Sequence, residues 1–263
     1  EYFIKRFDVD PSMLNINYRS SKKIVDFIKT VGYPNLQAEN DVIEIDYLPT
    51  PRNINKFEID INNNDVFKFL LDPTYETMAV TYEDGRSSQA NEFEATLVAG
   101  AILEAYNNFD SSAANYDEWF WKNGIGVVTP HKAQKVAIAI KLYEVFPKSQ
   151  HKLIDEAIDT VERFQGGQRK LILVSFGVGD PDIIAQEEEF LLNLNRTNVA
   201  ISRAESKVIV FISENLIHHL PQDKEIIKTA RAIKSYTHQY CDKKGVLQVI
   251  FKGKTKDLYV RYK

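Results

Sequence analysis

Short apolar runs alternate with amphipathic stretches through most of the chain. The runs are continuous and rich in β-branched residues, a pattern typical of strands that are buried on both faces. Between them, apolar residues recur every three or four positions, which predicts helices with one buried stripe. This alternation predicts an α/β fold in which helices cover both faces of a parallel sheet. The predicted strands are Met78–Tyr82, Ile125–Thr129, Ala157–Thr160, Leu171–Phe176 and Val208–Ile212.

Four helices are predicted from the same spacing. Ser20 and Ser21 precede the first helix and are typical N-cap residues, while Gly32 ends it. The second covers about 92–107 and the fourth about 191–204. The third helix begins after a proline, and its predicted inward face consists of Ala133, Val136, Ile140 and Tyr143.

The pattern is looser near both ends of the chain. Val42–Leu48 is a further candidate strand, and the Asn-rich, Pro-punctuated stretch after it predicts a peripheral insertion at about 49–77. Near the C-terminus, Val246–Phe251 and Leu258–Tyr262 flank a turn that contains Lys and Gly, which predicts a β-hairpin. We therefore expect a main domain over 1–220 and a C-terminal helix and hairpin extension over 221–263.

Composition and charge narrow the class of protein. With 263 residues, 44% hydrophobic and 27% charged, the chain has the mix of a globular domain. A net charge of -4 argues against a broad basic coat, so any nucleic-acid contact must be local. The apolar runs are too short to cross a bilayer, and the single Cys241 cannot form an internal disulfide. We expect a cytoplasmic (intracellular) protein without a membrane partner and, because Glu1 replaces Met, a longer natural polypeptide.

Four segments carry polar residues at predicted strand ends or helix starts. In parallel sheets, ligands bind beyond the carboxyl ends of the strands, so we expect these segments to meet there. Each has an ordinary structural explanation when taken alone: a solvated arginine, a helix start, a turn, or a surface helix whose Arg196 and Arg203 pair with nearby glutamates. The segments are Leu14–Ser20, Val128–Gln134, Ile158–Gln168 and Leu194–Ala204.

Together and in this order, the four segments resemble the C-terminal motor half of superfamily 1 helicases. That half is a RecA-like domain, marked by Asn-Tyr-Arg-Ser, Thr-Pro-x-x-Ala-Gln, Phe-Gln-Gly and Val-Ala-x-(Ser/Thr)-Arg-Ala. Asn91-Glu-Phe-Glu-Ala95 is similar to a segment of the branch that contains the nonsense-mediated-decay helicase, whereas the first motif also resembles UvrD and PcrA. The resemblance runs from about Leu14 to Ile212.

The resemblance implies a nucleotide site shared with a second domain. In this family ATP and Mg²⁺ lie between two RecA-like domains and are held mainly by the first, and no Gly-x-x-x-x-Gly-Lys-(Ser/Thr) loop occurs here. The fragment alone should therefore not hydrolyse ATP; its partner would be the upstream RecA-like domain of the same polypeptide. By the match, Arg203 is the arginine finger and Arg19 a second γ-phosphate contact. Gln165, Gly166 and Gln168 would lie near the nucleotide, although relatives usually carry Glu where Gln168 stands.

Nucleic acid is the second partner that the resemblance implies. Thr129, His131 and Thr160 match positions that contact the backbone of single-stranded DNA or RNA. The decay-factor branch suggests 5′ to 3′ movement, and the UvrD-like motif leaves the polarity open. The missing phosphate loop favours an alternative, a non-catalytic helicase-like module that binds nucleic acid or a protein. A nuclease has little support, because no cluster of carboxylates and lysine stands out.

Overall fold

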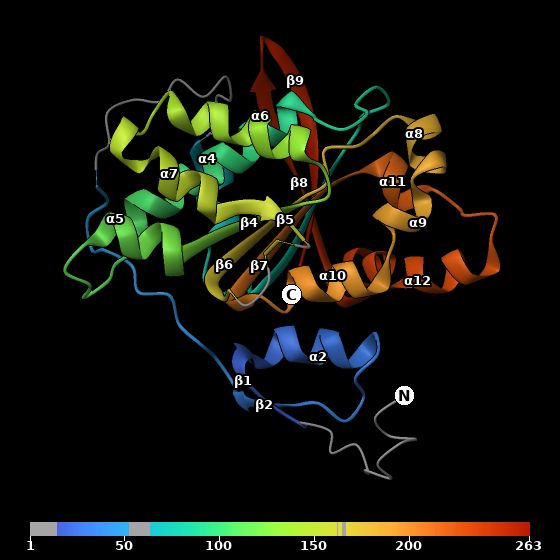
Figure 1. Ribbon diagram of the computed structural model, residues 1–263, viewed down its shortest axis with the longest axis horizontal. Coiled ribbons are helices and arrows are strands. Elements are labelled where there is room, and N and C mark those ends of the chain that lie inside the picture. The colour runs from blue at the N-terminus through green and yellow to red at the C-terminus, as the bar shows by residue number, and fades with distance from the viewer. Residues whose placement is uncertain (1–14, 53–63, 162, 165–166) are drawn as a thin grey trace.

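A seven-stranded sheet forms the centre of the computed structural model, which describes residues 15–52, 64–161, 163–164 and 167–263 (Figure 1). The strand order is β5-β4-β6-β7-β3-β9-β8, and the first five of these strands are parallel. The α/β fold with a mostly parallel, helix-covered sheet, predicted from the sequence, is confirmed. The strands are β3 (Thr77–Tyr82), β4 (Ile125–Thr129), β5 (Ile158–Thr160), β6 (Arg169–Ser175), β7 (Ala204–Ser213), β8 (Lys243–Phe251) and β9 (Lys254–Tyr262).

One face of the sheet is covered by the helices between residues 64 and 157. Alternate strand residues such as Ile209 and Phe211 point to this side and are fully buried there. Two of these helices, at 64–70 and 92–108, pack closely at Gly100 and Phe67. A Cβ added to Gly100 would lie 2.2 Å from the ring of Phe67, so the contact requires a glycine. The elements are α3 (Asn64–Leu70), α4 (Glu92–Asn108), α5 (Tyr116–Trp119), the π-helical turn η1 (Phe120–Gly124), α6 (Lys132–Tyr143) and α7 (Lys148–Ala157).

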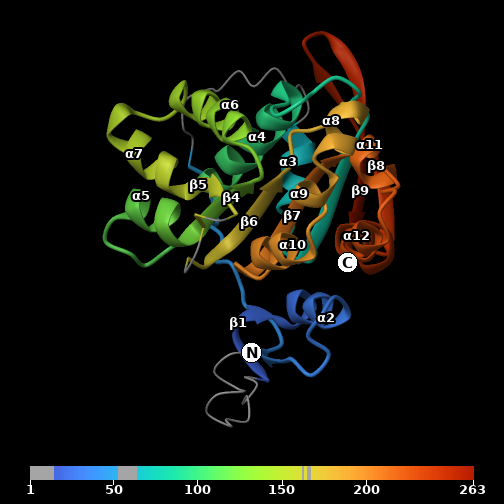
Figure 2. The ribbon, with the colours of Figure 1, turned by 45° about the vertical axis from the view of Figure 1, so that its right-hand side comes forward.

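The opposite face carries mainly the later helices, as the rotated view shows (Figure 2). Here the intervening strand residues, for example Val208 and Val210, form a second buried cluster. Tyr236 is fully buried in it, and its hydroxyl lies within hydrogen-bond distance of backbone groups of Met78 and Val208. The elements are α8 (Pro181–Gln186), α9 (Glu188–Leu191), α10 (Leu194–Ile201), α11 (Glu214–His218), α12 (Lys224–Ser235) and the π-helical turn η2 (Tyr236–Tyr240).

A small unit precedes the main sheet and packs below it in Figure 1. It consists of β1 (Ile16–Ser21), α2 (Lys22–Thr30) and β2 (Gln37–Asn40), with the two strands parallel. The predicted apolar stripe of its helix is confirmed, because Ile24, Phe27 and Ile28 join the second buried cluster. The unit is therefore fixed to the same face of the sheet as α10 and α12.

The predicted C-terminal hairpin forms, and it extends the main sheet. Strands β8 and β9 turn at Lys252 and Gly253, both of which have positive φ. Strand β9 pairs antiparallel with β3, so the hairpin supplies the two outer strands at that edge. In the expected insertion, residues 64–71 pack Val66 and Leu70 into the core. How the chain divides into domains stays a prediction.

Three local predictions were wrong. Residues 42–48 form no strand; their only pairing is an isolated bridge between Tyr47 and Phe109, because the backbone there bonds to the end of α4. The fourth helix is interrupted: α9 ends at Leu191 and Asn193 caps α10. Arg203 consequently follows that helix and does not share a regular face with Arg196.

The third correction concerns the buried face of α6. Val136 and Ile140 are 54% and 51% exposed, whereas Gln134, Ile138 and Leu142 are buried. The helix is thus rotated about its axis relative to the prediction, and a polar side chain explains this. The side chain of Gln134 bonds to buried partners on β6 and at the start of α4, and this brings the neighbouring face of the helix inward.

Candidate functional site

Three of the predicted nucleotide-site residues lie together, and we call Arg19, Gln168 and Arg203 the arginine cluster. Arg19 Nε donates to Gln168 Oε1 at 3.1 Å, and its Nη1 donates to the carbonyl of Ser202 at 3.4 Å. A backbone bond of 3.0 Å from Arg169 to the Arg203 carbonyl joins the two strand starts. Residues far apart in the sequence thus meet at one point.

The charges of the arginine cluster are not balanced by acids among the described residues. Burial, and then the nearby charge of Arg19, lower the pKa of Arg203. Arg203 Nε is buried and has no hydrogen-bond partner within the described part of the chain. Glu205, which lines the adjoining depression with Arg19 and Gln168, forms an ion pair with Lys170 at 3.2 Å. Two guanidinium groups held this way favour binding of an anion, which would provide acceptors for the free N–H groups.

The arginine cluster lies at the amino ends of the strands, not at the carboxyl ends where we expected it. Gln168 directly precedes β6 and Arg203 directly precedes β7, whose first residues Arg169 and Ala204 are register partners. The expectation failed because α10 runs back along the sheet, so its last turn and the residues after it arrive where β7 begins. An open depression of about 540 Å³ adjoins the cluster and is lined partly by Tyr18, Arg19 and Gln168.

Arg19 owes its position to the two serines that follow it. Ser20 Oγ donates to the Ala204 carbonyl at 2.7 Å, and Ser21 Oγ donates to the carboxylate of Glu76; both serines are fully buried. Neither hydroxyl caps α2, so the predicted capping role was wrong. The Ser20 hydroxyl instead bonds the small N-terminal unit to the start of β7, and the Ser21 hydroxyl bonds it to the loop before β3.

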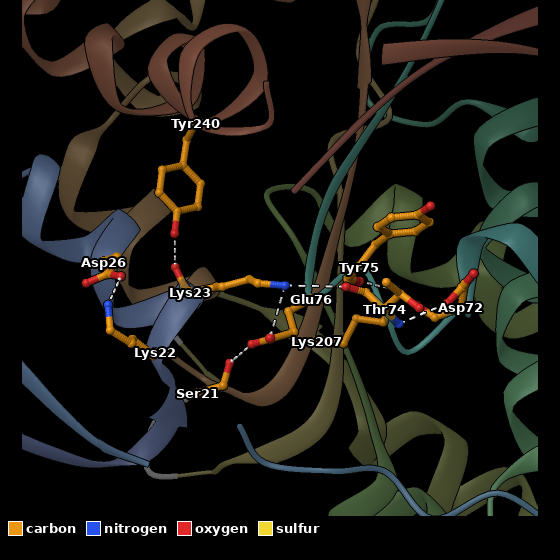
Figure 3. A network of polar contacts seen from close by, with 10 residues as sticks. All are labelled: Ser21, Lys22, Lys23, Asp26, Asp72, Thr74, Tyr75, Glu76, Lys207 and Tyr240. Carbon is orange, nitrogen blue, oxygen red and sulfur yellow. Dashed lines mark hydrogen bonds and ion pairs between the residues drawn. The ribbon is translucent and has the colours of Figure 1, made fainter. Parts of the chain in front are cut away.

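Further polar contacts join the same unit to the loop before β3 (Figure 3). Lys23 Nζ lies 3.3 Å from a Glu76 oxygen and donates to the Thr74 carbonyl, while Tyr240 donates to the Lys23 carbonyl. Beside them, buried Lys207 donates to backbone carbonyls of the 72–75 loop. Burial lowers the pKa of Lys207 to about 7. The N-terminal unit is therefore tied to the sheet through polar contacts as well as apolar packing.

The predicted nucleic-acid contacts gather at the opposite end of the sheet. Thr129 and Thr160 are register partners at the carboxyl ends of β4 and β5, and His131 is the N-cap residue of α6. His131 Nε2 lies 2.7 Å from Glu187 Oε2, while its Nδ1 is buried without a partner among the described residues. These three residues form one group. Their role stays a prediction, and the predicted nucleotide contacts Gln165 and Gly166 lie outside the described residues.

The segment between Thr160 and Gln168 connects the two ends of the sheet. Val128 pairs with Val174, so Thr129 is level with Ser175, whereas β6 begins six residues earlier at Arg169. At about 3.3 Å per residue, the two groups are roughly 20 Å apart along the strands. One short stretch of chain therefore leads from the threonine group to the arginine cluster.

A buried carboxylate that the sequence reasoning did not single out lies beside the threonine group. Glu94, on α4, accepts hydrogen bonds from Tyr82, Ser175, Gln134 and the amide of Gly177. Burial raises the pKa of Glu94 to about 7, although the bonds from Ser175, Tyr82 and Gly177 oppose this shift. We call these five residues the Glu94 network.

Asn91 connects the Glu94 network to the start of its helix. Asn91 Oδ1 accepts a hydrogen bond from the backbone amide of Glu94 at 2.8 Å, and the backbone amide of Asn91 donates to Gln134 Oε1 at 2.8 Å. The Asn-x-x-Glu-Ala and Thr-Pro-x-x-Ala-Gln segments thus meet in one network. The signal in the sequence was the place of Glu94 and Gln134 in these two motif segments.

The described residues contain neither a metal-binding cluster nor a membrane-spanning helix. No group of three or more His, Cys, Asp or Glu side chains there could hold a metal ion. Within the same residues, no helix is both long enough and apolar enough to cross a membrane.

The fold and these sites define a RecA-like α/β domain of the AAA type, and comparison with known proteins agrees. A family model described as "AAA domain" matches residues 1–215, so the chain belongs to this family. It is 30% identical over 237 residues to the uncharacterized ATP-dependent helicase MJ0104 of Methanocaldococcus jannaschii, covering 89% of this chain and 31% of that protein.

Other relatives are also named helicases. The DNA replication ATP-dependent helicase/nuclease DNA2 of Saccharomyces cerevisiae is 25% identical over 241 residues, which cover 86% of this chain and 14% of that protein. The probable RNA helicase armi of Drosophila melanogaster is 32% identical over 100 residues, 35% of this chain and 8% of that protein. This is thus a helicase-like AAA domain, and it spans about a third or less of the length of these relatives.

Proposed function

We propose that this chain is the second RecA-like motor domain of an ATP-dependent superfamily 1 helicase or translocase. It would supply Arg203 as the arginine finger and Arg19 as a second γ-phosphate contact to ATP and Mg²⁺ held mainly by an upstream RecA-like domain. The observation that carries the proposal is the arginine cluster. It holds two neighbouring guanidinium groups without an acidic partner among the described residues, and the buried Nε–H of Arg203 has no hydrogen-bond acceptor among them.

The cluster suits the charge that develops when a phosphoryl group is transferred. Negative charge spreads over the phosphoryl oxygens, and a guanidinium can donate two parallel hydrogen bonds to them. Gln168 fits this role because its amide holds Arg19 Nε without neutralising the arginine.

The second ligand of the proposed motor is single-stranded DNA or RNA, bound near Thr129, His131 and Thr160. Hydroxyl groups and amides at a helix N-terminus bind phosphate oxygens without a broad basic surface, which agrees with the net charge of -4. The segment between Thr160 and Gln168 would couple the two ligands, because movement at one end of the sheet is transmitted through a few residues to the other. Closure of the two domains on ATP would then change the contacts to the single-stranded nucleic acid.

The test compares two arginine variants in the full-length natural polypeptide that contains this chain. We expect Arg203→Ala to lower nucleic-acid-stimulated ATP hydrolysis by about 10³-fold or more, the usual effect of losing an arginine finger. Arg86→Ala is the control, since this exposed arginine lies outside the arginine cluster. The KM for ATP should change far less than the turnover number.

Two outcomes would overturn the motor proposal. Arg203→Ala with a rate near that of the wild-type protein would remove the arginine-finger role. A full-length protein that binds nucleic acid but hydrolyses no ATP would instead identify a non-catalytic helicase-like module.

A further inference from the structure

Charge is distributed very unevenly along this chain. Residues 221–263 contain eleven Lys and Arg against four Asp and Glu, a net charge of +7. The remaining 220 residues contain 22 Lys and Arg against 33 Asp and Glu, a net charge of -11. An acidic domain thus ends in a basic region, although the charge of the whole chain is only -4. Clustered basic charge of this kind is the usual mark of a surface that binds phosphates.

Part of this basic charge forms a stripe along one helix face. Lys228, Arg231, Lys234 and His238 follow one another at intervals of three or four residues on α12 and η2. Residues with this spacing lie on the same side of a helix. All four line one hollow of about 610 Å³, bounded on its other sides by Thr30 and neighbouring residues at the end of α2 and by the start of α10. We call this hollow the α12 groove.

No Asp or Glu lines the α12 groove. Lys228 does bond to Glu225 at 2.6 Å, but both side chains are largely exposed, and exposed pairs of this type contribute little and exchange readily. Lys234 donates one hydrogen bond to the His219 carbonyl, which leaves its other donors available. Burial, followed by the charge of Arg261, lowers the pKa of His238, and burial also lowers the pKa of Lys234. The exposed Lys228 and Arg231 therefore supply the most accessible positive charge of the groove.

We propose that the α12 groove binds the phosphate backbone of nucleic acid as a second contact, separate from the one at Thr129, His131 and Thr160. The distance from Lys228 to Lys234 is about 9 Å at 1.5 Å per residue. The phosphates of one strand of duplex DNA follow at roughly 3.4 Å along the helix axis and lie farther apart in an extended single strand, so this length spans more than one phosphate. A single free phosphate would engage only part of the stripe. The proposal rests on the proposed function only in taking nucleic acid as the ligand.

The test measures binding of the 263-residue chain to a fluorescein-labelled single-stranded 20-mer, as DNA and as RNA, by fluorescence anisotropy. The variant is Lys228→Gln/Arg231→Gln, two exposed residues on the groove. The matched control is Lys244→Gln/Lys254→Gln, which removes the same charge from exposed positions of the hairpin. Circular dichroism melting curves establish that both variants remain folded.

We expect the groove variant to weaken binding about tenfold at low salt and the control to weaken it less than twofold. Each phosphate contact to a single strand contributes about 0.7 to the slope of log affinity against log salt, so the groove variant should lower that slope by about 1.4. Three outcomes would overturn the proposal. Equal losses of affinity in the two variants would show that only net charge matters, and unchanged affinity in both would show that the groove does not contact the 20-mer. Binding of the chain to vesicles of anionic lipid without binding to the 20-mer would identify a different ligand.

The outcome is independent of the arginine-finger test. If Arg203→Ala leaves ATP hydrolysis unchanged while the groove variant loses the 20-mer, the motor proposal fails and the α12 groove stands. If Arg203→Ala abolishes hydrolysis and the groove variant binds the 20-mer normally, the motor proposal stands and the α12 groove proposal fails.

Discussion

The arginine cluster and the Glu94 network both consist of residues from the family-like motifs, but their hydrogen bonding differs. Glu94 is fully buried and accepts four hydrogen bonds from four different residues. Arg203, by contrast, has a buried Nε without a partner in the described chain. Buried polar groups are almost always paired, so an exception needs a cause. The Glu94 network is satisfied within the chain, whereas Arg203 Nε has no partner among the described residues. Under the proposed function, this N–H is available to a bound phosphate.

The largest expected difference between the Glu94 network and the arginine cluster is their contribution to the free energy of unfolding. Replacing Glu94 with Ala leaves the hydroxyls of Tyr82 and Ser175 without their acceptor inside the core. The Gly177 amide loses its acceptor too, whereas Gln134 keeps its bond to Ser175. We expect the free energy of unfolding to fall by about 3 kcal/mol, because each buried donor keeps its desolvation penalty. Urea unfolding at pH 8 measures it.

Arg203→Ala is the control for this measurement. It removes one of two like charges, so the free energy of unfolding should stay within about 0.5 kcal/mol of the wild-type value or rise slightly. Comparable losses in both variants would show that the arginine cluster is also a structural network, contrary to our interpretation.

A second test uses the raised pKa of Glu94. Because burial raises this pKa from 4.5 to about 7, the folded protein keeps a proton that the unfolded chain has released. Stability should therefore decrease as pH rises from about 5 to 7 and level off above 7, by at most about 1.4 kcal/mol per pH unit for one proton. The uncharged variant Glu94→Gln should lack this part of the slope. Parallel stability curves for the two proteins between pH 5 and 7 would contradict the assignment.

The smallest effect concerns the support of Arg19. Ser20→Ala removes the buried bond to the Ala204 carbonyl and should cost about 1 kcal/mol of stability. In the full-length protein, the turnover number for ATP should fall severalfold with little change in KM, since Arg19 is then held less firmly beside Gln168. Ser149→Ala, an exposed serine on α7 outside both proposed sites, is the control. An unchanged turnover number in Ser20→Ala would show that packing alone positions Arg19.

The sequence by itself determined the α/β class, the parallel strands from Thr77 to Ser213 and the C-terminal hairpin, because hydrophobic periodicity is a local property of the chain. It also predicted the buried stripe of α2. The motif segments identified Arg19, Gln168 and Arg203 as a set, and the fold brings all three to one point.

Only the tertiary structure decided which end of the sheet this set occupies and which face of α6 is buried. Gln134 shares the buried face of α6 with Ile138 and Leu142, and its amide is paired there with Ser175. Val136 and Ile140 consequently lie half exposed on the other side of the helix. The two serine hydroxyls that follow Arg19 bond to Ala204 and Glu76 instead of capping their helix, since they are buried against partners far away in the sequence. Such partners come together only on folding, so no local pattern could have shown them.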